Sequence, residues 1–201
     1  KFLKNFTTIL AAFVLATVLR TFLFQIYFIP SLSMFPNINI DDRVLVVKDE
    51  IIDYEYNLGD IVVFYAPQSP IPLSTDLLIG NLKIWNLITQ NEVNNQGTVY
   101  IKRIVGTPGD QVNIESNGSI FVNNIELKIK NVNNTNNGDL FDIKLSENEY
   151  FLVGDNRENS FDSRMFGPIS SDRIIGKAYF KIYPFNEFKN LNDWRSKLGQ
   201  K

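Results

Sequence analysis

The sequence predicts a mainly β domain that follows one apolar N-terminal helix, and three observations support this prediction. First, the chain after Ile38 consists of short β-branched and aromatic runs separated by Gly, Asp and Asn, a pattern typical of an all-β domain. Second, the chain begins with a long apolar run. Third, 201 residues with 44% hydrophobic content can bury the core of one sizeable domain or of two small ones.

The apolar N-terminal run lies between basic residues. Residues 6–19 are apolar on all faces of a helix, Lys1 and Lys4 precede them, and Arg20 follows. The helical stretch between Lys4 and Arg20 is about 22 Å long, so it crosses a bilayer only if both charged side chains reach opposite interfaces. Basic residues before the span favour an N-terminus on the inside. A cleaved secretory signal peptide and a buried core helix are the two alternatives to an anchor.

The predicted strands and insertions divide the chain into two parts. We expect residues 1–24 to form a membrane anchor and residues 25–201 to form an extracytoplasmic β-rich domain. Surface insertions are expected at about residues 67–96, with a short helix around residues 82–89, and at residues 131–138. The strands are expected in the segments RVLVVK, DIVVFYA, TVYIKRIVG, QVNI, SIFVNN, YFLVGD and KAYFKIY.

The composition excludes several kinds of chemistry. The chain has no cysteine and no histidine, so it contains no disulfide, no thiolate nucleophile and no Ser-His-Asp triad. A formal net charge of -2 without a basic patch gives no reason to expect nucleic acid as a partner. If the chain performs nucleophilic catalysis, a Ser, Thr or carboxylate must attack and a Lys, Asp or Glu must accept the proton.

The first candidate segment is PSLSMFP, from Pro30 to Pro36, directly after the apolar run. The two prolines stiffen the backbone around Ser31 and Ser33. A nucleophilic serine benefits from a rigid bend because its approach angle is set in advance, and neighbouring N–H groups can face a developing oxyanion. The alternative is a plain turn with solvated serines.

The second candidate segment is YIKRIVGTPGD, from Tyr100 to Asp110. Lys102 and Arg103 are neighbours in an apolar strand, so their side chains point to opposite faces and one of them must face the interior. Burial lowers the pKa of a lysine from about 10.4 and makes the neutral amine accessible as a base. The alternative is an edge-strand lysine in water.

The third candidate segment is GDNRENSFDSRMFG, from Gly154 to Gly167. This dense run of turn-forming and charged residues follows the predicted strand YFLV, and many internal hydrogen bonds are needed to give it one shape. We expect Asp162 and Arg164 to pair and to hold the loop. The alternative is an ordinary solvated loop.

Taken in this order, these segments resemble the conserved boxes of the bacterial type I signal peptidases, membrane-bound serine proteases with a Ser-Lys dyad. PSLSMFP resembles their nucleophile box, LGDIVVF their next strand, YIKRIVGTPGD their lysine box and GDNRENSFDSRMFG their last box. The resemblance extends from about Phe6 to Gly176, apart from the two insertions. It implies an antiparallel, barrel-like peptidase domain with only a small second β subdomain.

The resemblance also implies a role for individual residues. Ser33 corresponds to the nucleophile and Lys102 to the general base, while the Ser31 hydroxyl and the Ser33 N–H form the oxyanion hole and Ser160 orients Lys102. Support of the loop is expected from Asp155, Asn156, Asp162 and Arg164. The pockets for small residues at the first and third positions before the cut are expected to be lined by Tyr27, Ile29, Ile38, Tyr100 and Ile101.

The expected partners are secretory preproteins with small residues before the cleavage site, and the lipid bilayer, with no nucleic acid. The implied location is the cytoplasmic membrane, with a single span, the N-terminus inside and the catalytic domain outside. The Ser-Lys mechanism needs no metal or cofactor. One departure from the family is Leu32, where members usually have glycine between the two serines; an ordinary extended backbone or contact of leucine with lipid would explain it.

Other functions remain open at this level. A related Ser-Lys processing peptidase with a different substrate, such as a self-cleaving repressor or a pilin peptidase, would share the motifs. A membrane-tethered β module that binds lipid or protein without catalysis is the alternative of a different class. An inactive paralogue is disfavoured because Ser33, Lys102 and Ser160 are all present.

Overall fold

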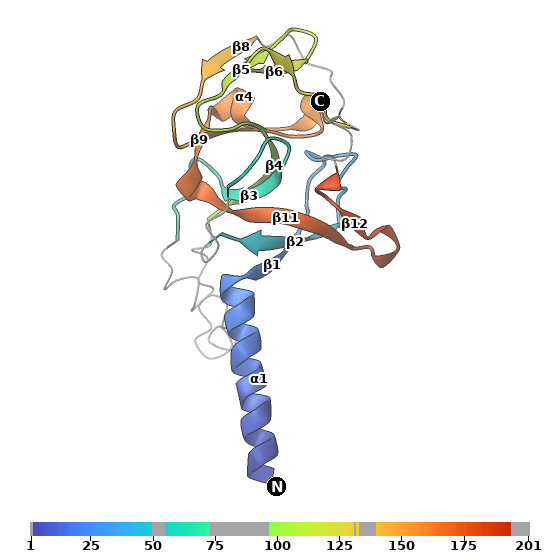
Figure 1. Cartoon of the computed structure of the whole chain (residues 1–201). Helices are drawn as coiled ribbons and strands as arrows, with labels where there is room; N and C mark the ends of the chain where they lie inside the picture. The colour runs from blue at the N-terminus through green and yellow to red at the C-terminus, as the bar shows by residue number, and fades with distance from the viewer. Residues whose placement is uncertain (1, 50–54, 73–96, 131, 133–139, 194–201) are drawn as a thin grey trace.

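The structure, a computed structural model, describes residues 2–49, 55–72, 97–130, 132 and 140–193. Within these residues the architecture is mainly β, as predicted, with two antiparallel sheets and one long helix (Figure 1). The helix expected around residues 82–89 and almost all of the 131–138 loop lie outside the described residues, as does the tail after residue 193.

The main sheet has eight strands, and its strand order is β1-β2-β11-β3-β4-β9-β10, with β12 added beside β11. All of its pairings are antiparallel. In the described part of the chain the outer strands β1 and β10 do not pair, so the sheet stays open instead of closing into a barrel. Its strands are β1 (Phe24–Phe28), β2 (Arg43–Lys48), β3 (Ile61–Tyr65), β4 (Val99–Gly106), β9 (Glu149–Val153), β10 (Ile169–Ser170), β11 (Ile174–Tyr183) and β12 (Lys189–Asn190).

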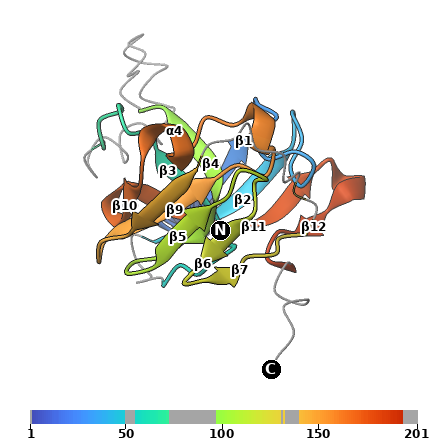
Figure 2. The same cartoon turned by 90° about the horizontal axis from the view of Figure 1, so that it is seen from above.

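The second sheet is small, as expected, and its order is β7-β6-β5-β8. It lies on the side of the main sheet away from the N-terminal helix, nearest to the viewer in Figure 2. Its strands are β5 (Gln111–Ile114), β6 (Ile120–Val122), β7 (Ile125–Glu126) and β8 (Phe141–Lys144). The short helical elements are η1 (Arg157–Asn159), α4 (Ser163–Phe166), η2 (Ser171–Arg173) and η3 (Phe185–Glu187).

The buried side chains form three clusters because the central strands are covered on both faces. All five residues of β3 are buried, and they alternate between clusters: Ile61, Val63 and Tyr65 enter the first, Val62 and Phe64 the second. The third cluster joins the two sheets and contains Val105, Val112, Ile114, Ile120, Val122, Leu145, Phe151 and Val153. Each such buried aliphatic or aromatic side chain contributes about 1.5–3 kcal/mol of transfer free energy.

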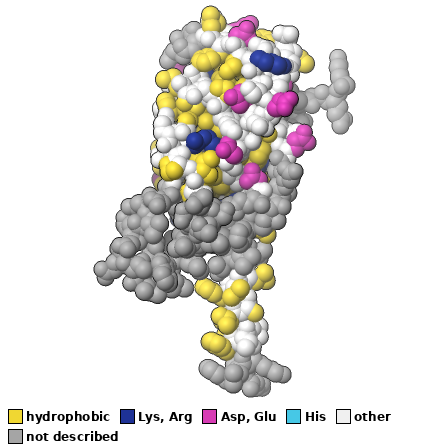
Figure 3. All heavy atoms as spheres, turned by 90° about the vertical axis from the view of Figure 1, so that its left-hand side faces the viewer, with side chains coloured by type: hydrophobic (Ala, Val, Ile, Leu, Met, Phe, Trp, Pro, Cys, Tyr) yellow, Lys and Arg dark blue, Asp and Glu magenta, His cyan; other side chains and the backbone are white. Residues whose placement is uncertain are grey.

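The N-terminal helix α1 (Phe2–Phe22) extends away from the sheets (Figure 1). Its apolar side chains line the projecting helix in Figure 3. More than half of the surface is exposed for Phe6, Ile9, Leu10, Phe13, Val14 and Leu15. This exposure contradicts the alternative of a buried core helix. The described residues contain no helix whose length and apolar character would let it span a bilayer, so the expected membrane-spanning helix is not supported.

The chain changes from helix to strand near the expected domain boundary at residue 24. The apolar segment after α1 forms β1, which pairs with β2 through five residue pairs from Phe24–Val47 to Phe28–Arg43. β1 is an outer strand of the sheet, and the side chains of Phe24, Ile26 and Phe28 point outward and are 42–56% exposed. Exposed apolar side chains are therefore present both on α1 and on the outward face of β1.

Candidate active site

Ser33 and Lys102 lie in direct contact. The Lys102 Nζ donates hydrogen bonds to Ser33 Oγ at 2.8 Å and to the Ile101 carbonyl at 3.0 Å. Only 7% of Ser33 and 4% of Lys102 is exposed. Lys102 belongs to β4, where it is paired with Val62 of β3, so its backbone is held on a rigid strand.

The pKa of Lys102 is lowered to about 8, because burial disfavours the ammonium form. The carboxylates of Asp162 and Asp155 oppose this shift without cancelling it. The Tyr100 ring, with its centroid 5.6 Å from the Lys102 Nζ, covers the amine on one side. A lysine with this pKa is neutral in about one molecule in ten at pH 7, so it can accept the proton of the serine that it contacts.

Arg103, the neighbour of Lys102, is also buried, with 3% of its surface exposed. The sequence required only one of the two side chains to be interior, but β4 lies between covered faces and both are buried. Arg103 forms a bidentate ion pair with Asp155, through Nε at 2.7 Å and Nη2 at 2.6 Å, and it donates to the Gly59 carbonyl. The buried charge of Arg103 is thus fully paired, as burial requires.

The turn that carries Ser33 is held by its own backbone and by two buried side chains. Phe35 N–H donates to the Leu32 carbonyl and Ile38 N–H donates to the Met34 carbonyl, both at 3.0 Å. Met34 and Ile38 are completely buried in the first cluster. Leu32 is 39% exposed and does not have a positive φ, so leucine fits here because the backbone does not need the left-handed region.

The segment Gly154–Gly167 holds this turn from the other side through hydrogen bonds. Asn156 N–H donates to the Ser33 carbonyl at 3.0 Å, and the Asn156 side-chain amide donates to the Leu32 carbonyl at 3.1 Å. Gly154 allows this approach, since a Cβ there would lie 2.6 Å from the Ser33 carbonyl oxygen and 2.2 Å from Ser160 Oγ. The turn that carries Ser33 and the loop after β9 are therefore packed backbone against backbone.

The expected pairing of Asp162 and Arg164 is present, with Nε 2.9 Å from Oδ1. Asp162 is also the N-cap of α4 and accepts the Gly154 N–H at 2.9 Å, so one carboxylate ties the helix start to the loop. The Ser163 hydroxyl accepts the Leu152 N–H at 3.0 Å. These bonds give the loop after β9 a single shape.

The remaining expected site residues differ in how close they lie to Ser33 and Lys102 and in which buried cluster they join. Ser31 Oγ lies 3.4 Å from Ser33 Oγ. The Ser160 hydroxyl is buried and has no hydrogen-bond partner in the described structure. Tyr27, Ile29, Ile38 and Ile101 share the first cluster, whereas Tyr100 packs against the second.

Comparison with protein families identifies the chain. Residues 2–183 match the model of the family described as signal peptidase, peptidase S26. The chain belongs to this signal peptidase family. It is therefore a hydrolase, a serine endopeptidase, and the expected family resemblance is confirmed.

Signal peptidases are also the relatives that this chain resembles. A probable signal peptidase I-2 of Synechocystis sp. is 31% identical over 186 residues, which are 92% of this chain and 75% of the relative. A signal peptidase I of Leptolyngbya laminosa is 30% identical over 192 residues, with 94% and 83% covered. The crystal structure of a signal peptidase I from Enterococcus faecalis V583 superposes with a TM-score of 0.42 at 23% identity, covering 62% of this chain and 97% of that one.

Two polar residues of this signal peptidase contact the site region without having been expected there. Asn37 donates from Nδ2 to Asp155 Oδ2 at 2.8 Å, and Lys189 Nζ donates to Asn37 Oδ1 at 3.2 Å. Asn37 directly follows the segment PSLSMFP, and a polar residue between Pro36 and the buried Ile38 was a detectable signal. Lys189 lies 152 positions away and had no such signal.

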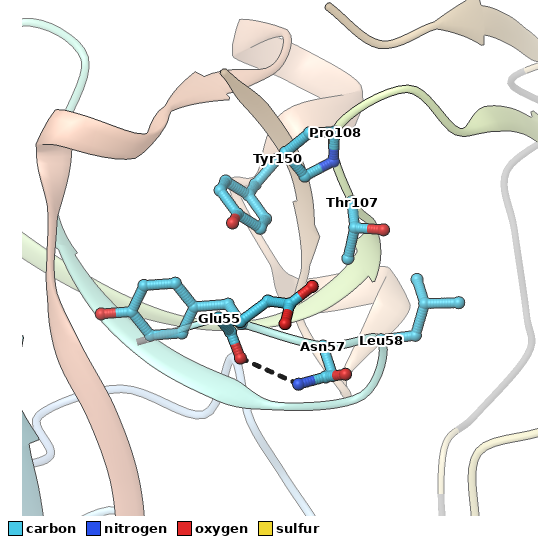
Figure 4. A pocket seen from close by; sticks show the side chains of 7 residues that line it. Glu55, Asn57, Leu58, Thr107, Pro108 and Tyr150 are labelled. Carbon is cyan, nitrogen blue, oxygen red and sulfur yellow. Dashed lines mark hydrogen bonds between the residues drawn. The ribbon is translucent and has the colours of Figure 1, made fainter. Parts of the chain in front are cut away.

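A separate cavity lies between the segment Glu55–Leu58 and the turn with Thr107 and Pro108 that follows β4, beside Tyr150 of β9 (Figure 4). Its volume is about 510 Å³, and it is lined by Glu55, Tyr56, Asn57, Leu58, Thr107, Pro108 and Tyr150. None of the expected site residues lines it, and it pairs no serine with a base. Across the residues that the structure describes, no three acidic side chains are grouped so that they could hold a metal ion.

Proposed function

We propose that this chain removes N-terminal signal peptides from exported preproteins, with Ser33 as the nucleophile and neutral Lys102 as the general base. The observation that carries the proposal is the 2.8 Å contact between Lys102 Nζ and Ser33 Oγ. Membership of the signal peptidase family and the names of the relatives support the substrate class.

The reaction follows two steps of acyl transfer. Neutral Lys102 accepts the proton of the Ser33 hydroxyl while Oγ attacks the carbonyl carbon of the residue before the cut. The amide C–N bond then breaks, the leaving amine takes the proton from Lys102, and an ester to Ser33 remains. Water gives a proton to the same lysine and attacks the ester carbonyl. The C–Oγ bond then breaks, Ser33 Oγ takes the proton back from Lys102, and the signal peptide leaves with a free carboxylate.

The oxyanion of each tetrahedral intermediate needs donors that are already in place. The Ser31 hydroxyl, 3.4 Å from Ser33 Oγ, and the Ser33 N–H are the proposed donors. The hydrogen bonds from Asn156 to the Leu32 and Ser33 carbonyls support this role, because they hold the peptide unit that contains this N–H and the peptide unit that follows it. Ser160, whose Oγ is buried and has no hydrogen-bond partner in the described structure, is the proposed orienting partner of Lys102.

The pockets for small residues before the cut are proposed to lie over the first cluster. Ile29 and Ile38 are almost completely buried, so they would form the floor of a shallow depression, with Tyr27 and Ile101 at its sides and Tyr100 beside Lys102. A filled floor leaves room for a methyl group and excludes longer side chains, which fits a preference for alanine at these positions.

We propose that the reaction occurs at a membrane surface, on its extracytoplasmic side. Exposed apolar side chains lie on α1 between Phe6 and Leu15 and on the outward face of β1, and Leu32 and Phe35 of the turn that carries Ser33 are 39% and 42% exposed. Burial of such side chains in the interface would place Ser33 where a membrane-inserted signal peptide ends. Flotation with phospholipid vesicles tests this part of the proposal.

The decisive test is cleavage of a preprotein with alanine at the first and third positions before the cut, with products identified by mass. The proposal requires one cut after the second alanine by the wild type and loss of this cut in Ser33→Ala and Lys102→Met. The matched control is Ser119→Ala, a serine in the turn before β6 of the second sheet, which should cleave normally. Cleavage at wild-type rate by Ser33→Ala would exclude this mechanism, and a cut elsewhere would favour a related processing peptidase.

A further inference from the structure

A short chain of hydrogen bonds joins the C-terminal strand β12 to the nucleophile turn. Lys189, the first residue of β12, donates from Nζ to Asn37 Oδ1 at 3.2 Å. Asn37 is 92% buried, and its Nδ2 donates to Asp155 Oδ2 at 2.8 Å. The amide of Asn37 therefore lies between an ammonium group and a carboxylate.

These two charges select one orientation of the amide. The carboxylate of Asp155 accepts hydrogen bonds and the ammonium of Lys189 donates them, whereas an amide has one accepting and one donating end. The flipped amide would place its oxygen against the carboxylate and its NH₂ against the ammonium, which are two repulsive contacts. Lys189 thus holds Asn37 in the orientation that binds Asp155 through a charge-assisted hydrogen bond.

Asp155 transmits this constraint to both members of the dyad. On one side its carboxylate binds Arg103, the residue next to Lys102, through two bonds of 2.7 and 2.6 Å. On the other side the next residue, Asn156, donates its N–H to the Ser33 carbonyl at 3.0 Å. A shift of Asp155 would therefore move the backbone clamp on Ser33 relative to the strand that carries Lys102.

We propose that Lys189 is a positioning residue for the hydrolysis, which acts through Asn37 and Asp155 to keep Ser33 and Lys102 in hydrogen-bond contact. This inference rests on the proposed function of the dyad. It assigns β12, which is outside the motifs of the family, to the catalytic machinery. The role of Lys189 depends on its charge and donor, so arginine should replace it in part and methionine should not.

The test compares Lys189→Met, Lys189→Arg and the matched control Lys128→Met, whose side chain is 75% exposed in the segment that follows β7. We expect Lys189→Met to lower kcat for the preprotein about tenfold with KM within twofold, because positioning acts on the chemical step. Lys189→Arg should recover most of kcat, and Lys128→Met should keep the wild-type value. A wild-type kcat in Lys189→Met would overturn the proposal.

A double-mutant cycle tests whether the effect passes through Asn37. Lys189→Met combined with Asn37→Ala should be no slower than Asn37→Ala alone, because the second change removes an interaction that is already lost. If the losses in kcat of the two single variants multiply in the double variant, the proposal is overturned. All variants are compared at one temperature below their melting points, so a lower stability of one variant does not affect the result.

A readout without substrate separates this inference from the proposed function. Hydrogen exchange of the Asn156 amide reports on its bond to the Ser33 carbonyl. We expect about tenfold faster exchange in Lys189→Met and no change in Lys128→Met. Unchanged exchange in Lys189→Met would overturn the inference even if the wild type cleaves, whereas a wild type without cleavage but with the expected exchange would count against the proposed function alone.

Discussion

The Lys102 Nζ lies 2.8 Å from Ser33 Oγ, although the two residues are 69 positions apart in the sequence. Lys102 is held by the pairing of β4 with β3, and Ser33 is held by a turn that is clamped by Asn156 from the loop after β9. The contact therefore depends on three separate segments of the chain. In the described structure, Ser33 carries the only hydroxyl that the Nζ of Lys102 contacts, and the pKa of this lysine is lowered.

The pH dependence of cleavage should follow the ionisation of Lys102. In the proposed mechanism the neutral amine is the active form. Since the pKa of Lys102 is lowered to about 8, kcat/KM should rise about tenfold per pH unit below pH 8 and level off above it. Stopped assays at constant ionic strength between pH 5.5 and 9.5 measure this profile. A midpoint near 10.4, or a profile that falls as pH rises through 8, would contradict the assignment.

Lys102→Met should be inactive and more stable than the wild type at pH 7. The pKa of Lys102 is lowered from 10.5 to about 8, so burying its charged form lowers the free energy of unfolding by as much as about 3 kcal/mol at pH 7. The unfolded state binds more protons between pH 8 and 10.5, so wild-type stability rises through that window and the advantage of the variant should shrink there. Urea unfolding at pH 7 and pH 10 measures both values, and a constant difference would contradict this account.

Gly154→Ala should reduce cleavage by more than about tenfold, because the new Cβ would lie 2.6 Å from the Ser33 carbonyl oxygen and must displace the nucleophile turn. Gly109→Ala is the matched control. It lies at a φ of 80° with no atom within 4 Å of a new Cβ, so it should cost about 1 kcal/mol of stability through backbone strain and leave kcat unchanged. Equal activity in the two variants would argue against close packing at Gly154.

Arg103→Met should destabilise the protein by about 3–5 kcal/mol, since it leaves the buried carboxylate of Asp155 without its bidentate partner. Lys128→Met breaks the exposed ion pair with Glu126 and should cost no more than about 1 kcal/mol. Thermal or urea unfolding compares the two. A loss below 1 kcal/mol for Arg103→Met would show that Asp155 finds another partner.

Ser160→Ala should leave stability unchanged to within about 0.5 kcal/mol, because the buried hydroxyl that it removes has no partner in the described structure. If Ser160 orients Lys102 during the reaction, kcat should nevertheless fall at least about tenfold. Parallel unfolding and cleavage measurements separate the two effects. A stable variant with wild-type kcat would remove Ser160 from the mechanism.

Most strands could be predicted from local sequence, because alternating or continuous β-branched runs between turn residues are recognisable without contacts. β1 was harder, since its residues FQIYF continue the apolar run of α1, and only pairing with β2 makes them a strand. The two-residue strands β7, β10 and β12 were missed because they carry no periodic signal and form only by pairing with β6, β9 and β11. The strand β8, which pairs with β5, was missed as well. The open edge of the main sheet was likewise not visible in the sequence.

The sequence by itself determined the mainly β class, the family and the identity of the dyad candidates, because these depend on residue types in fixed local order. Only the tertiary structure decided that Lys102 and Arg103 are both buried, that Gly154 must accept the Ser33 carbonyl, and that Lys189 reaches Asn37. The physical reason is that burial, pKa and hydrogen-bond partners depend on which distant segments pack together. Those contacts arise from the pairing of the sheet as a whole and have no counterpart in the local pattern.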